Sequence, residues 1–253
     1  MTQAYSDQFS DIYNFSRWKS FSETVAPKIH NFYQRRVSTL PSVMLDVCCG
    51  GGQLANYFLK HDFEVFGFDL SERMIYHAKN NNKEFIDRGD AHFFVKNAVN
   101  FTFDEKFSLI TATYDAMNHI ETKTELEKAF SSIFKVLSND GFFIFDMNTE
   151  KGLENWNGIF VEDHKEMMVV NRGFFNKPEG KAFNKTSGFI QVKKDLYKRF
   201  DELLFNKVYK IKDVREILLS IGWSKVHFAS SKSLEKEINE PEKENRVFII
   251  AKK

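Results

Sequence analysis

A carboxylate and a run of glycines form the first group of residues that could bind a ligand. Asp46 lies near the end of the apolar run 43–47, and Gly50, Gly51 and Gly52 follow it. Glycine accepts positive φ and lets a ligand approach the backbone, while the free N–H groups of a helix start face that ligand. A carboxylate here would repel the pyrophosphate of a dinucleotide. The pattern favours a ligand that carries a cation and hydroxyl groups.

A second carboxylate, Asp69, ends the apolar run 64–69, about twenty residues after the glycines. An acid at this spacing can form two hydrogen bonds to the hydroxyl groups of a ribose. The alternative role for Asp69 is to cap the helix that begins after Ser71. We expect Asp69 to bind the ribose of a nucleoside ligand.

Polar side chains follow two later apolar runs, 107–113 and 142–145. Asp115, Asn118 and His119 follow the first run, and Asn148 follows the second. Ligands bind at the carboxyl ends of strands in open parallel sheets, so these residues are candidates for contacting a substrate. The ordinary pKa of histidine lies near physiological pH, which makes His119 a candidate general base. His119 could equally cap the helix that follows or pack behind the bound nucleoside ligand.

The apolar runs alternate with helical patterns, which predicts a doubly wound α/β fold. The clearest helix runs over 126–137 and ends before Gly141. We expect a mostly parallel, Rossmann-like sheet of seven strands, over 43–47, 64–69, 91–96, 107–113, 142–145, 225–229 and 246–251. The charged segment 231–245 is predicted to be a mobile connection, and Asp213 is predicted to cap the last helix.

The stretch Asp46-x-Cys48-x-Gly50-x-Gly52 resembles the first motif of the class I S-adenosylmethionine-dependent methyltransferases, acid-x-Gly-x-Gly-x-Gly, with Cys48 in place of the first glycine. Residues 9–14 are similar to the Phe-x-x-x-Tyr-Asp opening of the small-molecule members. Residues 115–120 resemble their motif after the fourth strand. The resemblance implies the same sheet, S-adenosylmethionine as cofactor and a small-molecule acceptor.

The resemblance also implies site residues. Tyr13 would reach the cofactor carboxylate, Trp18 would line the site, and Met74 would pack on the adenine. Asn97 would accept a hydrogen bond from the adenine amino group, with the N–H of Ala98 meeting a ring nitrogen. The full set of expected cofactor contacts is Tyr13, Trp18, Asp46, Cys48, Gly50, Gly52, Asp69, Leu70, Met74, Asn97, Ala98, Thr113 and Tyr114. The expected acceptor contacts are Asp115, Asn118, Asn148 and Arg172.

Three regions are expected. Residues 1–36 carry many aromatic side chains and form an N-terminal helical cap. Residues 37–150 and 211–253 form the cofactor-binding domain. Residues 151–210 form an inserted antiparallel β lid, where small-molecule methyltransferases elaborate the acceptor pocket. A dimer interface is the alternative use of this insert, and the chain is expected to be a monomer or a homodimer.

Composition excludes several classes of protein. The formal net charge of +1 argues against a nucleic-acid substrate, which requires clustered Lys and Arg. The sequence has no apolar stretch of about eighteen residues, so no membrane helix is predicted. The polar N-terminus does not resemble a secretory signal. The two cysteines, Cys48 and Cys49, are adjacent and have neither disulfide nor metal-ligand spacing. We expect a cytoplasmic protein with no metal.

The predicted function is methyl transfer from S-adenosylmethionine to a nitrogen or oxygen of a small molecule. Two alternatives remain open at this point. One is a non-catalytic module that binds S-adenosylmethionine or S-adenosylhomocysteine. The other is an NAD-dependent oxidoreductase on the same general fold, which Asp46 opposes.

Overall fold

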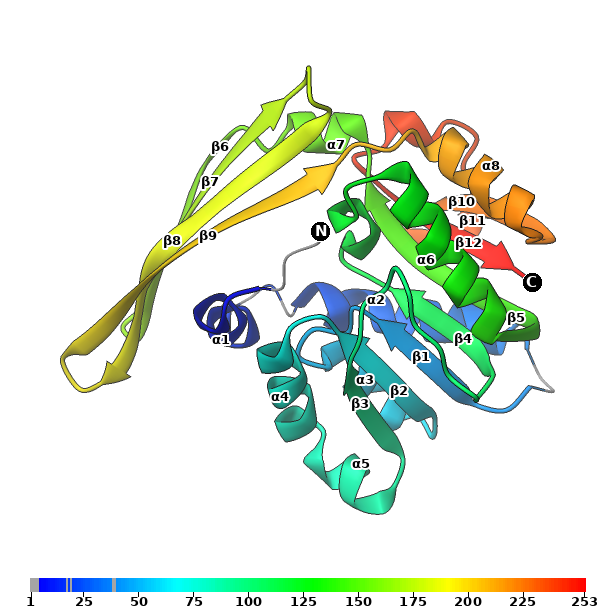
Figure 1. Cartoon of the computed structure of the whole chain (residues 1–253), viewed down its shortest axis with the longest axis horizontal. Helices are drawn as coiled ribbons and strands as arrows, with labels where there is room; N and C mark the ends of the chain where they lie inside the picture. The colour runs from blue at the N-terminus through cyan, green and yellow to red at the C-terminus, as the bar shows by residue number, and fades with distance from the viewer. Residues whose placement is uncertain (1–4, 17, 19, 38–39) are drawn as a thin grey trace.

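Two β-sheets organise the chain, as the computed structural model in Figure 1 shows; it describes residues 5–16, 18, 20–37 and 40–253. The main sheet has eight strands in the order β11-β10-β12-β5-β4-β1-β2-β3. A separate sheet has four antiparallel strands in the order β6-β7-β8-β9. We call this second sheet the lid, because it extends from the main domain toward the N-terminal helix α1.

Most strands of the main sheet are short apolar runs buried between helices. Strands β1 to β5 pair in parallel, whereas β12 runs antiparallel to β5 and β10 runs antiparallel to β12. Parallel strands need both faces covered, which explains why β4 is buried along its whole length. The bounds are β1 Val43–Val47, β2 Glu64–Asp69, β3 Ala91–Val95, β4 Phe107–Ala112, β5 Leu137–Asn148, β10 Lys225–Ser230, β11 Ser233–Glu237 and β12 Arg246–Lys252.

Helices cover both faces of the main sheet. On one face, α6 and α8 bury Phe130 and Leu218 in a core with Phe143 of β5. On the other face, α2, α3, α4 and α5 form a second core, in which Phe32 and Phe58 pack with Ile144. The bounds are α2 Ser20–Gln34, α3 Gln53–Leu59, α4 Glu72–Asn81, α5 Lys83–Arg88, α6 Lys123–Val136 and α8 Ile211–Ile221. Short helices η2 Ala116–His119, α7 Glu150–Glu154 and η3 Pro241–Lys243 complete the main domain.

The lid is one continuous stretch between α7 and α8. Its strands are β6 Gly158–Asp163, β7 Met167–Asn176, β8 Lys181–Lys193 and β9 Leu196–Lys207. A turn over 176–180 joins β7 to β8, and Gly180 has a φ of 58° there, which favours glycine. Met167, Val169 and Phe200 pack with Ile12 of α1. The face of the lid that carries these residues therefore faces α1.

Helix α1, Asp7–Phe15, lies between the lid and the main domain (Figure 1). Asp11 accepts hydrogen bonds from Arg73 Nε at 2.6 Å and from His77 Nε2 at 2.7 Å, which joins α1 to α4. The backbone N–H and hydroxyl of Ser6 donate to Glu202 of β9. Helix α1 thus contacts both parts of the molecule. The first four residues of the predicted cap lie outside the described residues.

The predicted fold class is confirmed, with one additional strand. Segment 231–245, predicted to be a mobile connection, contains β11 and η3. Leu234 of β11 is buried while its charged neighbours Glu235 and Lys236 are exposed, as an edge strand permits. Helix α8 begins at Ile211 with Lys210 as N-cap, so the predicted capping role of Asp213 is wrong. Among the described residues, no helix combines the length and the apolar character needed to cross a bilayer.

Candidate active site

The glycine loop after β1 has the backbone that a close ligand approach requires. Gly50 and Gly52 have φ of 52° and 74°, in the left-handed region. A Cβ on Gly52 would lie 2.7 Å from Asn82 Nδ2 and 3.2 Å from Ala78 Cβ, so only glycine fits beside α4. Cys48 also has a positive φ, 57°. A non-glycine residue in this region costs about 1 kcal/mol, which explains why the related motif has glycine at this position.

Asp69, at the end of β2, is buried and faces this loop. One carboxylate oxygen accepts a hydrogen bond from the N–H of Gly50 at 3.0 Å, and the other accepts one from the N–H of Ser71 at 3.0 Å. Burial raises the pKa of Asp69, whereas these backbone hydrogen bonds lower it. Each oxygen keeps a further lone pair for a ligand hydroxyl. The capping alternative is also present in part, since Ser71 itself caps α4 by accepting from Met74 N.

Asp46 is a buried carboxylate with one hydroxyl partner. Its Oδ1 accepts a hydrogen bond from Thr111 Oγ1 at 2.8 Å, and the residue is only 2% exposed. Burial raises the pKa of Asp46 from its ordinary 3.8 to about 7, although the Thr111 hydroxyl lowers it. A cationic ligand beside Asp46 would stabilise the ionised form.

A group of amide side chains joins α1 to the glycine loop. Asn14 Oδ1 accepts hydrogen bonds from Gln53 Nε2 at 3.1 Å and from Asn81 Nδ2 at 2.9 Å. Asn81 Nδ2 also donates to the carbonyl of Gly51 at 2.8 Å. Tyr13 lies above Gly50, with its ring 3.8 Å from the position of a Cβ there. The predicted cofactor contact Tyr13 is therefore at the loop. The amide group is one that sequence reasoning missed.

Aromatic rings from α1, α2 and the turn after β4 gather beside the loop. Tyr13 lies 5.7 Å from the Trp18 ring and 6.3 Å from the Tyr114 ring, measured between centroids. Phe21 stacks on Tyr114 at 4.7 Å. Tyr5 was missed as a site residue, although burial and the nearby Asp69 and Asp115 raise its pKa well above the ordinary value. Tyr5 precedes α1, and its place among the many aromatic residues of the predicted N-terminal cap is the signal that could have found it.

The turn after β4 is strained and is fixed by a buried carboxylate. Tyr114 and Asp115 both have positive φ, 64° and 53°. Their N–H groups donate to the two oxygens of Asp146, at 2.7 and 3.0 Å. Arg246 of β12 donates to Asp146 and, at 2.6 Å, to Asp115. Its guanidinium also lies over the ring of Phe21 at 4.8 Å. Sequence reasoning missed Arg246.

His119 lies at the end of η2, near the lid. Its Nε2 is 3.4 Å from Asn206 Nδ2 and 3.8 Å from the Asp115 carboxylate, which is too long for a hydrogen bond. Burial lowers the pKa of His119, and the nearby Asp115 and the backbone of Phe205 oppose that shift. The imidazole is therefore neutral at pH 7 and can accept a proton.

Two of the expected acceptor contacts, Asn118 and Asn148, join the main domain to the lid. Asn118 Nδ2 donates to the carbonyls of Asn148 and Lys207, and its Oδ1 accepts from Asn148 N. Asn148 Nδ2 donates to Asn206 Oδ1 at 2.9 Å. Asn118 is fully buried with both amide hydrogens in use. It fixes the base of the lid and does not face an acceptor, which corrects its expected role.

Arg172 is the expected site residue that the structure separates from the others. It lies opposite Ile159 and Lys185 in the lid register, on the face turned away from α1, and donates to Ser187 at 2.7 Å. Its expected role as an acceptor contact is therefore wrong. The alternation of side chains along a strand decides this, and the sequence did not fix the register.

The remaining expected residues lie along the same edge of the main sheet. The N–H of Lys96 donates to the carbonyl of Asp69, so Asn97 and Ala98 follow directly beside Leu70. Asn97 Oδ1 accepts from Val99 N at 2.9 Å and keeps one lone pair for a ligand. Met74 is fully buried on α4, and Thr113 directly follows β4. Their cofactor contacts stay predictions.

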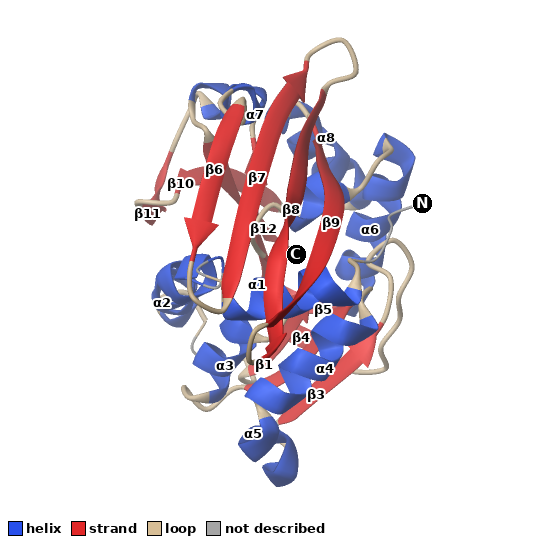
Figure 2. Ribbon diagram, turned by 90° about the vertical axis from the view of Figure 1, so that its left-hand side faces the viewer, coloured by secondary structure: helices blue, strands red, loops and turns tan. Residues whose placement is uncertain are grey.

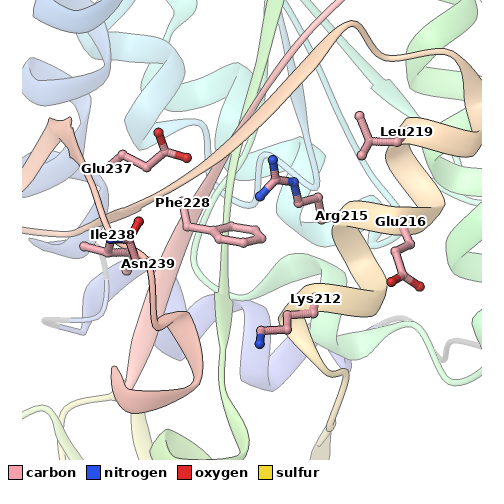
Figure 3. Close-up of a pocket in the computed structure, with 8 residues that line it drawn as sticks. All are labelled: Lys212, Arg215, Glu216, Leu219, Phe228, Glu237, Ile238 and Asn239. Atoms are coloured by element: carbon pink, nitrogen blue, oxygen red, sulfur yellow. The ribbon is translucent and has the colours of Figure 1, made fainter.

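Two cavities lie in different parts of the molecule. One, of about 440 Å³, is lined by Trp18, Ser20, Phe21, Thr24, Val25, Lys28, Tyr114 and Ser231. The other, of about 360 Å³, lies between α8 and the strands β10 and β11, and none of the expected site residues lines it (Figure 3). There the guanidinium of Arg215 lies 5.8 Å from the ring of Phe228. Only the first cavity reaches the aromatic group beside the glycine loop.

Comparison with known proteins agrees with this geometry. The sequence profile of a methyltransferase domain matches residues 44–141, which include the glycine loop and Asp69. A Geobacillus sp. (strain WCH70) protein, whose name proposes a methyltransferase, is 25% identical over 241 residues, which cover 94% of this chain and 93% of that protein. Together these matches support a class I S-adenosylmethionine-dependent methyltransferase. The predicted family, enzyme class and cofactor are confirmed, and the two alternatives are not supported.

Two further comparisons concern this methyltransferase. The solved structure of an S-adenosylmethionine-dependent methyltransferase from Clostridium acetobutylicum has the same fold, with a TM-score of 0.79, 23% identity and 97% of each chain covered. A Streptomyces venezuelae protein named dTDP-3-amino-3,4,6-trideoxy-alpha-D-glucopyranose N,N-dimethyltransferase is 26% identical over 137 residues, which cover 54% of each chain.

The residues present fit the cofactor of this methyltransferase. Asp46 is a carboxylate whose pKa is raised by burial, and the ammonium group that S-adenosylmethionine carries would stabilise its ionised form. Asp69 keeps acceptor lone pairs at the loop for ribose hydroxyls. We propose that Asp46, Asp69 and the backbone of the glycine loop hold the cofactor.

Asp46 makes the stability of the ligand-free methyltransferase depend on pH. Its pKa is about 7 when folded, so the folded protein holds a proton that the unfolded chain loses near 3.8. This stabilisation is complete below the unfolded pKa and is lost as pH rises toward 7, up to about 4 kcal/mol in all. We expect Asp46→Asn, which cannot ionise, to exceed the wild type in melting temperature by a larger margin at pH 8 than at pH 5. Parallel melting curves for the two proteins from pH 5 to 8 would contradict the raised pKa.

Proposed function

We propose that this methyltransferase transfers a methyl group to a nitrogen or oxygen of a small-molecule acceptor. The observation that carries the proposal is the cavity of about 440 Å³ lined by Trp18, Phe21 and Tyr114. This volume is that of a site for a small ligand, and the cavity adjoins the rings that cover the glycine loop. Clustered basic side chains for a nucleic acid do not line it, so we keep a small molecule as the proposed partner.

The inner face of the lid supports an acceptor with hydrogen-bond donors. Asn171, Thr186 and Asn206 are buried polar residues on this face. Thr186 Oγ1 donates to Asn171 Oδ1 at 2.7 Å, whereas the buried Oδ1 of Asn184 accepts no hydrogen bond from the described residues. A buried carbonyl oxygen without a donor is costly. An acceptor hydroxyl or amine would satisfy it.

A nitrogen acceptor is favoured over oxygen by one relative. The Streptomyces venezuelae protein is named as an N,N-dimethyltransferase of a dTDP-linked amino sugar. When bound, S-adenosylmethionine supplies a methyl group on a positively charged sulfur, which is already activated for displacement. The chain then contributes alignment and exclusion of water, through Tyr13, Trp18 and Tyr114. A neutral amine needs no strong base before it attacks.

Replacing His119 tests whether this side chain takes a proton from the acceptor. Because His119 is neutral at pH 7, it can take the proton that an amine or hydroxyl releases. If it does, His119→Ala lowers kcat about 100-fold or more and leaves the affinity for S-adenosylhomocysteine within about twofold. The measurement is steady-state turnover beside calorimetric binding. An unchanged kcat would remove His119 from the reaction and leave alignment as the chain's contribution.

Methyl transfer to defined acceptors tests the function itself. The purified enzyme would be given S-adenosylmethionine with a labelled methyl group and matched pairs of amino and hydroxy sugars. We expect labelled N-methyl or O-methyl product together with an equal amount of S-adenosylhomocysteine. A protein that binds S-adenosylhomocysteine but labels none of a broad panel of amines and alcohols would contradict the proposal.

We also keep the cytoplasm as the proposed location, because both cysteines are free thiols.

A further inference from the structure

Half of the exposed large apolar side chains among the described residues lie on one face of the lid. The strand register defines this outer lid face: Ile159, Arg172, Lys185 and Leu203 lie side by side across the four strands. Ile159 is 71% exposed and Leu203 is 63% exposed. The apolar members of the outer lid face are Ile159, Val161, Met168, Phe174, Phe189, Tyr197 and Leu203.

The two faces of the lid differ in what covers them. The inner face packs Met167, Val169 and Phe200 against Ile12 of α1. Figure 2 views the lid from outside, and no drawn helix or strand crosses the outer lid face. Alternating strands in a single-layer sheet normally carry polar residues on the open side. An open sheet face that carries this many exposed apolar side chains marks a protein contact.

The size of the outer lid face is that of a dimer interface. Four strands about 4.8 Å apart and about ten residues long cover roughly 600 Å² in projection. Because side chains project from the sheet, the accessible area is larger than the projected area. It is close to the roughly 800 Å² that each partner buries in a standard interface. Two antiparallel sheets pack face to face by interdigitating such side chains.

The charges on this face are complementary between two copies of the same chain. Arg172, Lys185 and Arg199 are positive, and Asp163 and Asp201 are negative. A face of mixed sign does not call for a strongly acidic or basic partner. Asp163 and Arg199 lie in one row across the sheet, at opposite edges, because Met168 and Phe189 join them in the register. A twofold axis parallel to the strands therefore brings Asp163 of one copy over Arg199 of the other.

We propose that the enzyme is a homodimer in which the outer lid faces of two copies pack together about a twofold axis. The edge of the lid is a poorer contact, because the edge strand β9 carries Lys198, Arg199, Asp201, Glu202 and Lys207, which oppose strand addition. In the dimer, each lid is held from outside by its copy while its inner face contacts α1. The interface contains none of the residues that we assign to cofactor binding.

Light scattering after size-exclusion chromatography measures the molar mass in solution and so tests the proposed dimer directly. We expect the wild type to have twice the chain mass of 29.7 kDa over a wide concentration range. Phe189→Lys with Leu203→Lys should give a monomer whose affinity for S-adenosylhomocysteine is unchanged, which shows that it is folded. Leu219→Lys is the matched control, because Leu219 is 43% exposed on α8, outside the lid, and this variant should stay a dimer.

A charge exchange tests the twofold arrangement. Asp163→Arg alone should weaken the dimer, since two like charges then meet at each end of the interface, and adding Arg199→Asp should restore it. A wild type that is monomeric at every concentration would overturn the proposal, as would a dimer that survives both lysine substitutions. A dimer weakened equally by the single and the double exchange would exclude this twofold packing.

Discussion

Replacing Asp69 by alanine is expected to weaken binding of S-adenosylhomocysteine by about 100-fold or more. Two charge-assisted hydrogen bonds to ribose hydroxyls contribute about 1.5 to 3 kcal/mol each, and alanine removes both. The variant also leaves the N–H groups of Gly50 and Ser71 without their carboxylate acceptor, so the glycine loop loses its fixed conformation. Calorimetric titration with S-adenosylhomocysteine measures the effect.

Asp69→Asn separates the charge from the shape of this side chain. An amide keeps one oxygen acceptor but turns an NH₂ group toward either Gly50 N or Ser71 N, both of which are donors. We expect an affinity between those of the wild type and the alanine variant. Asp87→Ala, which removes an exposed carboxylate on α5, is the control and should bind as the wild type does. An alanine variant with wild-type affinity would refute the ribose role.

Arg246→Met is expected to lower the free energy of unfolding by about 3 to 5 kcal/mol, because it leaves the buried Asp115 and Asp146 without their cation. Methionine has a similar length but no charge. The strained turn at Tyr114 and Asp115 then depends on two backbone hydrogen bonds to an uncompensated carboxylate. We expect kcat to fall together with stability, since Tyr114 lines the proposed acceptor cavity.

Two further variants distinguish positioning from general instability. Arg246→Lys keeps the charge but cannot contact both carboxylates through a planar fork, so it should recover most of the stability and less of kcat. Arg246→Met combined with Asp115→Asn removes one of the two unpaired charges and should melt at a higher temperature than Arg246→Met alone. Thermal unfolding at pH 7 and steady-state kinetics give both readouts. An Arg246→Met protein with wild-type melting temperature and turnover would show that this ion network is dispensable.

The parts of the fold that were predictable are those with a strong local signal. A short local pattern predicts each of three features: the glycine turn, the helix that begins after Ser71 and the periodic helix 126–137. The order of strands and helices follows from them. The prediction that Asp46 and Asp69 bind the cofactor has the same basis, because a carboxylate at a strand end next to glycines has few other uses. Local pattern was sufficient where one element decides the geometry.

The parts that could not be predicted depend on contacts between distant segments. Arg246 meets Asp115, 131 residues away, because β12 runs antiparallel to β5 and begins at the ligand edge of the sheet. The strand over 246–251 was predicted, so a basic residue at its start was the available signal. Arg172 was assigned to the wrong face because lid register depends on pairing with β6 and β8. Asn118 was misread because its partners lie in β5 and β9.

The lid leaves the main domain after α7 and returns before α8 as one uninterrupted stretch of chain. Its length and the chemistry of both its faces can therefore change without shifting the register of any strand in the eight-stranded sheet. Over evolutionary time, such an enzyme can acquire a new acceptor or a new quaternary contact by substitution within a single segment, while the residues for the methyl donor stay as they are. For protein engineering, residues 158–207 are accordingly a natural cassette to exchange between relatives.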